Sequence, residues 1–159
     1  MTGPDPLAAP TGSGAPADPA SIWRVATVVR VEMHLPSQYP LVVLQEVVPP
    51  QRQARIPVGL PEGTAIAYAL SRRPTPRPLT HQLFSDVLDR HGVSVEAVRL
   101  TAVVEGNVVA ELETSSRAGR HVVPCRPSDG FALALRRQPP VPIVVADWVL
   151  TELSGSQPG

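Results

Sequence analysis

Apolar and polar side chains alternate over residues 22–33 (IWRVATVVRVEM), which is the pattern of a strand with one buried face. Two further apolar runs, at 41–48 and 54–58, follow it after proline-rich turns, so we expect three consecutive antiparallel strands. On the first strand, the side chains expected to share one face are those of Trp23, Val25, Val29, Val31 and Met33.

A second group of strands is predicted in the later half of the chain. Residues 93–114 contain two apolar runs joined at Glu105-Gly106-Asn107, where Gly106 and Asn107 are expected to supply the positive φ angles of a tight hairpin. Residues 120–125 and 141–145 predict a further strand and a short buried one. The complete sheet should therefore have about seven strands.

Three alanine- or leucine-rich segments predict helices, although one of them has an ambiguous pattern. Residues 61–73 (PEGTAIAYALSRR) alternate with a period of two, but their alanine content, a glutamate in the first turn and two arginines in the last favour a helix. Residues 127–137 (PSDGFALALRR) predict a second helix capped by Ser128 or Asp129. Residues 146–155 predict a short last one.

The helix with the most complete set of signals is predicted over residues 79–92 (LTHQLFSDVLDRHG). Thr80 is expected to be its N-cap, Leu79 and Phe84 to form a hydrophobic staple, and Gly92 to end it in a left-handed conformation. If this helix faces the core, Leu83→Ala should cost about 2–5 kcal/mol. Its buried stripe is expected to comprise Leu83, Phe84, Val87 and Leu88.

One arrangement occurs twice along the chain. It begins with a strand, continues through a turn that contains proline, an acidic residue and glycine, and ends in a helix whose last residues are two arginines. The two copies are residues 54–76 (ARIPVGLPEGTAIAYALSRRPTP) and 120–140 (RHVVPCRPSDGFALALRRQPP). Aligning the two copies by their acidic residues and aligning them by their paired arginines give registers that differ by three residues. We therefore interpret the pattern as a structural duplication without residue-by-residue equivalence.

These elements predict a single α+β domain with a mixed or antiparallel sheet and several helices. The proline-, alanine- and glycine-rich residues 1–20 are expected to be a disordered tail, 21–154 the domain and 155–159 a flexible C-terminus. No run is apolar enough for a membrane helix and no secretory signal is recognised, so we expect a soluble cytoplasmic protein without membrane contact.

Charge and cysteine content restrict the chemistry. The 14 basic residues, all arginine, balance 14 acidic ones, so the net charge provides no general attraction for polyanions. The single cysteine, Cys125, excludes an internal disulfide and a thiolate-cluster zinc site. Cys125 could be a reactive thiol beside Arg126 or, as free cysteines more often are, a small buried apolar residue.

Four segments carry a resemblance to a known family. "IPVGLPEGTAIAYAL", "RPLTHQLFSDVL", "RPSDGFALALR" and "PIVVADWVL" resemble, in order and spacing, the signature blocks of the bifunctional nuclease domain family, over residues 22 to 153. The resemblance implies an α+β fold, a dimer or higher homo-oligomer, a groove as the active site, and DNase or RNase activity. It also implies nucleic acid as a partner.

A nuclease needs groups that activate water and groups that stabilise charge on the phosphoryl oxygens. Glu62, His81 and Asp129 are the candidate catalytic residues, because the duplication would bring the two acidic helix starts together. A divalent metal such as magnesium or manganese is a candidate cofactor, with ligands unknown. The candidate substrate-binding residues are Arg77, Thr80, Arg126 and Ser128.

Each of these residues also has a structural interpretation, as a helix cap, a first-turn acid or a member of an ion pair. Two departures from the family pattern favour that view, because Gln82 and Pro124 stand where relatives usually carry aspartate. The alternative function is therefore a catalytically weak or inactive dimeric module that binds nucleic acid, an anion or a protein partner through the same groove.

Overall fold

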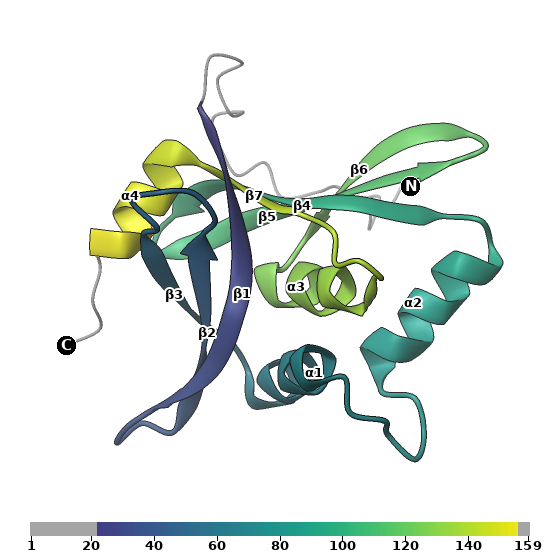
Figure 1. The fold of residues 1–159 in the computed structure, drawn as a ribbon, viewed down its shortest axis with the longest axis horizontal. Coiled ribbons are helices and arrows are strands. Elements are labelled where there is room, and N and C mark those ends of the chain that lie inside the picture. Colours follow the sequence, from purple (N-terminus) through teal and green to yellow (C-terminus); the bar gives the residue numbers. More distant parts are fainter. Residues whose placement is uncertain (1–21, 156–159) are drawn as a thin grey trace, which may run out of the picture.

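The computed structural model of the chain describes residues 22–155, which form one seven-stranded mixed sheet and four helices (Figure 1). The predicted α+β class is confirmed. The elements in chain order are β1 (Trp23–His34), β2 (Tyr39–Glu46), β3 (Gln53–Pro57), α1 (Leu60–Ser71), α2 (Thr80–Arg90), β4 (Ser94–Val104), β5 (Asn107–Ser116), β6 (Gly119–Cys125), α3 (Pro127–Arg136), β7 (Ile143–Ala146) and α4 (Asp147–Gly155).

The sheet has the strand order β3-β2-β1-β7-β4-β5-β6. Each half is an antiparallel meander of three strands followed by a helix, so the predicted duplication is present as two βββα units. β7 lies between the halves, antiparallel to β1 and parallel to β4. The hairpin between β4 and β5 turns at Glu105 and Gly106, whose φ angles are 50° and 77°, one residue earlier than predicted.

The core lies between the sheet and the helix pair α1 and α3. α1 packs on β1 and β2, α3 packs on β4 and β5, and the two helices contact each other inside the bend of the sheet (Figure 1). Phe131 and Ile66, from α3 and α1, are fully buried there. The alternation in α1 is therefore compatible with a helix, because small alanines fill the positions between its larger core residues.

The predicted buried faces of β1 and α2 are wrong in part. Ala26 and Val28 are buried on β1, whereas Val25 and Val29 are exposed, and a register shift between Val28 and Arg30 returns Val31 to the core. Such a bulge changes which side chains point inward. Of the helices, α2 packs mainly on α3, so it has only one fully buried residue, Ser85. The apolar residues of α2 that stay exposed are Leu83, Phe84 and Val87.

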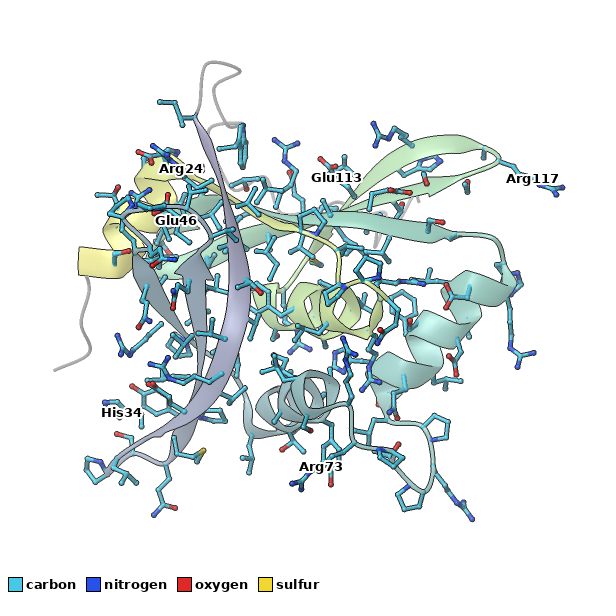
Figure 2. All side chains as sticks on the ribbon, viewed as in Figure 1. Arg24, His34, Glu46, Arg73, Glu113 and Arg117 are labelled. Atoms are coloured by element: carbon cyan, nitrogen blue, oxygen red, sulfur yellow. The ribbon has the colours of Figure 1, made fainter. Side chains whose placement is uncertain are left out.

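A buried ion cluster, here called the Glu46 cluster, joins α4 to the first three strands. It consists of Arg24, Glu46, Arg52 and Asp147, and Figure 2 labels Arg24 and Glu46 near α4. The Glu46 side chain is fully buried and accepts hydrogen bonds from Arg52 Nε at 2.9 Å and Nη2 at 3.1 Å. Arg52 and Arg24 also donate to Asp147, which begins α4.

Each helix within residues 22–155 is too short or too polar to cross a lipid bilayer. The predicted disordered tail at 1–20 and residues 156–159 of the predicted flexible C-terminus lie outside the described residues.

Candidate functional site

The starts of the helices differ from the predicted caps. Arg126, in extended conformation with φ −73° and ψ 145°, occupies the N-cap position of α3, and neither Ser128 nor Asp129 caps the helix. Leu79, rather than Thr80, occupies the N-cap position of α2, and its N–H donates to Gln82 Oε1 at 2.6 Å. The polar side chains at these starts are therefore available for other contacts.

Four of these side chains, from three helix starts, form what we call the Arg126 cluster: Glu62, His81, Arg126 and Asp129. Arg126 binds Asp129 with two hydrogen bonds, Nε to Oδ2 at 2.8 Å and Nη2 to Oδ1 at 3.0 Å. Its Nη1 lies 3.0 Å from Glu62 Oε1. His81 Nε2 lies 2.8 Å from Asp129 Oδ1. Arg126 thus bridges the two acids that the duplicated pattern placed at corresponding helix starts.

The protonation of the cluster follows from these contacts. Burial alone would raise the pKa of Asp129, but hydrogen bonds from Arg126 and His81 outweigh it, so the pKa lies below its usual value. Asp129 is therefore ionised at neutral pH and accepts the hydrogen bond from His81 Nε2–H. In neutral His81 this tautomer leaves Nδ1 as a base, and Nδ1 has no hydrogen-bond partner within residues 22–155.

The cluster opens on a cavity of 560 Å³, here called the Arg126 pocket, between the starts of α1, α2 and α3. Arg126 remains 65% exposed although it holds both acids. Its contacts use three of the five guanidinium N–H groups, so two can still bind a phosphate oxygen. Thr80 lines the pocket beside His81 and is exposed.

Two predicted substrate-binding residues do not join the cluster. Arg77 is exposed on the connection between α1 and α2 and does not line the Arg126 pocket. Ser128 is 7% exposed and faces a different hollow, between the end of β3 and the start of α3. The sequence pattern placed both residues beside the site but did not show which way their side chains point.

The donor set does not fit a divalent metal. Within residues 22–155 there is no group of three or more histidine, cysteine, aspartate or glutamate side chains that could hold an ion. Both carboxylates of the cluster are already bound to Arg126. We therefore derive no step through magnesium or manganese.

Cys125 is not poised as a nucleophile. Burial, together with the negative charge of Asp129, raises the pKa of its thiol to about 11, so the thiol is protonated at neutral pH. Of the two interpretations of this residue, the structure favours the packed one, because Cys125 contacts the core.

The two departures from the family pattern occupy different surroundings. Gln82 Oε1 also accepts a hydrogen bond from Thr75 Oγ1 at 2.8 Å, so Gln82 ties the preceding loop to α2 and faces away from the Arg126 pocket. Pro124 lies closer, on the wall of an apolar pocket that also contains His81 and Asp129. An aspartate at 124, but not one at 82, would therefore add charge near the cluster.

That apolar pocket is the part of the site that the sequence did not reveal. It has a volume of 600 Å³ and lies between α2, α3 and the strands β5 and β6, and it is called the Phe84 pocket below. Phe84 and Leu88 of α2 line it, together with Leu112 and Val123. The sequence pattern assigned Phe84 to the core, and only the packing of α2 on α3 leaves it facing this pocket.

Comparisons with known proteins show the family of the chain. Residues 42–157 match the bifunctional nuclease domain, and the chain belongs to that family. Two relatives come from Mycobacterium tuberculosis, namely uncharacterized protein MT1877 (strain CDC 1551 / Oshkosh) and uncharacterized protein Rv1829 (strain ATCC 25618 / H37Rv). Each is 35% identical over 125 residues, which cover 79% of this chain and 73% of the relative.

Proposed function

We propose that this chain hydrolyses phosphodiester bonds of RNA or DNA at the Arg126 cluster. The observation that carries the proposal is the arrangement of a paired histidine and aspartate beside an exposed arginine, all opening on one cavity. Membership of the bifunctional nuclease domain family supports a nuclease or nucleic-acid-binding role.

In this mechanism Arg126 binds a non-bridging oxygen of the phosphodiester with its two remaining N–H groups. His81 Nδ1 takes a proton from water, and Asp129 stabilises the imidazolium that forms. The water oxygen forms a bond to phosphorus while the bond to the leaving oxygen breaks. The leaving oxygen then takes a proton from His81, which gives a phosphomonoester and an alcohol. Glu62 holds Arg126 in place for this step.

The test is cleavage of end-labelled single-stranded RNA and DNA by the wild type and by His81→Ala, Asp129→Ala, Glu62→Ala and Arg126→Ala. We expect His81→Ala to lower the rate by about 100-fold or more, which is the usual contribution of a general base. Arg77→Ala is the matched control for Arg126→Ala, because Arg77 is an exposed arginine outside the cluster. Cleavage that persists at wild-type rate in the His81 and Asp129 variants would refute this site. Reactions with and without magnesium or manganese should give the same rate, because the cluster does not offer a ligand set for either ion.

A second candidate function is a non-catalytic module that binds nucleic acid, a small anion or a protein partner through the same groove. It is favoured by the engagement of both acids with Arg126, which leaves no free carboxylate in the cluster. Binding of labelled strands that depends on Arg126, without cleavage under any of the conditions above, would select the nucleic-acid version of this candidate.

We also propose that two copies of the chain associate. The exposed side chains of Val25 and Val29 on β1 are apolar surface for contact with a second copy. Sedimentation equilibrium should give twice the monomer mass. A monomer at micromolar concentration would contradict this proposal without affecting the Arg126 cluster.

A further inference from the structure

The Phe84 pocket and the Arg126 pocket meet at the pair formed by His81 and Asp129. Both pockets are lined by Thr80, His81 and Asp129, so the two pockets adjoin each other at these residues. One pocket presents a guanidinium group, and the other presents mainly apolar side chains. A ligand that fills both must therefore join an anionic group to an uncharged, largely apolar one.

The shape and chemistry of the Phe84 pocket narrow the apolar part of that ligand. Phe84 lines this pocket and is 47% exposed as a residue, although large aromatic residues are usually covered in the core. Leu88, Leu112 and Leu133 form the apolar walls. Thr80 and His121 add polar groups that can bond to the edge of a flat ring. An exposed aromatic ring in such surroundings is a stacking surface for a nucleobase.

We propose that the Phe84 pocket holds an unpaired nucleobase, next to the phosphate bound at Arg126, and that the substrate is therefore single-stranded nucleic acid. This inference rests on the proposed function for the position of the phosphate. A base in a duplex is paired and stacked on both faces, so it cannot enter a pocket in the protein unless the strand is opened. Every base has an apolar face, so the pocket accepts bases of any sequence.

The experiment measures binding by fluorescence anisotropy with three labelled ligands, of which the two single strands have equal numbers of phosphates and the duplex has twice as many. These are an eight-nucleotide thymidine strand, the same strand with abasic sugars at its central positions, and a duplex of eight base pairs. We expect the wild type to bind the normal strand about tenfold more tightly than the abasic strand, since stacking of one base is lost. The duplex should bind at least as weakly as the abasic strand.

Phe84→Ala should remove the preference for the normal strand and leave binding of the abasic strand unchanged. Leu83→Ala is the matched control, because Leu83 is an exposed apolar neighbour on α2 that does not line the pocket. This variant should keep the full preference. Both substituted side chains are about half exposed, so both variants should fold.

The outcomes separate this inference from the proposed function. Equal binding of the normal and abasic strands, or binding of the duplex as tight as that of the single strand, would overturn the base pocket. If such binding still requires Arg126, the phosphate site at Arg126 is supported and the base pocket is refuted. A base preference that depends on Phe84 but not on Arg126 would support the pocket and refute the phosphate site. Absence of any binding would overturn both.

Discussion

Residues 22–155 contain two clusters in which arginines bind two carboxylates, and they differ in what surrounds them. In the Glu46 cluster the central acid is fully buried, and its partners lie on β1, on the connection between β2 and β3, and at the start of α4. In the Arg126 cluster the central arginine is 65% exposed, a histidine takes part, and two cavities adjoin it. Paired charges alone therefore do not distinguish a functional site from a structural contact.

The pKa values of Glu46 and Asp129 reflect the different partners of these two carboxyl groups. The hydrogen bonds from Arg52 lower the pKa of Glu46, and both ions of that pair lie where they hold elements of the fold together. Asp129 also has a lowered pKa, but its partners include His81, whose remaining ring nitrogen can act as a base. Within residues 22–155, the Arg126 cluster differs from the Glu46 cluster in pairing its charged groups with a histidine.

The largest expected effect is in the buried cluster. Glu46→Ala leaves Arg52 without its main partner in a half-buried position, and we expect a loss of about 3 kcal/mol in the free energy of unfolding. Urea denaturation followed by circular dichroism measures this loss. Glu113→Ala breaks the more exposed pair with Arg99 and should cost under about 1 kcal/mol. Equal losses in the two variants would show that burial does not set the strength of these pairs.

The next effect concerns the backbone that positions the Arg126 cluster. A Cβ atom added at Gly130 would lie 2.8 Å from Val98 Cγ1, so Gly130→Ala must move α3 away from β4. We expect a loss of about 1–3 kcal/mol, measured by thermal denaturation. Gly155→Ala, in the last turn of α4 with open space around it, is the control and should change stability little. A stable Gly130→Ala variant would indicate that the contact between α3 and β4 is loose.

A smaller effect is expected from Asp129 itself, and it depends on pH. Because the pKa of folded Asp129 is lowered, its stabilisation is fully present above the unfolded value of about 3.9 and is lost as the pH falls through the folded pKa. Asp129→Asn should therefore cost about 1 kcal/mol at pH 7 and progressively less below pH 4. Urea titrations across this range test the sign. A difference that does not change with pH would mean that the charge of Asp129 contributes nothing.

The smallest effect is expected at Leu83. The sequence pattern predicts a cost of about 2–5 kcal/mol for Leu83→Ala, but this side chain is 57% exposed, so we now expect a change within about 0.5 kcal/mol. Leu133→Ala, on the buried face of α3, should show the larger cost instead. Chemical denaturation of the two variants side by side decides which helix faces the core.

Local patterns predicted most of the elements, because their signals lie within each segment. The helix at α1 was predicted against its own alternation, from alanine content and the charges at its ends. The buried face of β1 could not be predicted, because the register shift after Val28 depends on pairing with β2. The predicted N-caps, Thr80 for α2 and Ser128 or Asp129 for α3, were wrong for a related reason. Several residues near a helix start can occupy the N-cap position, and tertiary contacts select one of them.

The duplicated helix starts predict that Glu62, Arg126 and Asp129 lie close together, but they do not predict the distances between these side chains. The two residues outside the cluster, Arg77 and Ser128, show the limit of that reasoning. Adjacency in sequence does not determine the direction of a side chain at a loop or in a first helical turn. The Phe84 pocket was missed because an amphipathic helix looks the same in sequence whether its apolar face meets the core or a cavity.

The position of β7 has a consequence for how the molecule is made. The first three strands and the next three share no direct pairing in the sheet, and only three residues of β7, Ile143, Val144 and Val145, pair with both β1 and β4. During synthesis, β1 and β4 therefore lack the strand that pairs with both of them until residue 146 has been added. A chain terminated before residue 143 would contain every residue of the Arg126 cluster and could still pack α1 on α3, but it would lack the strand that joins the two half-sheets.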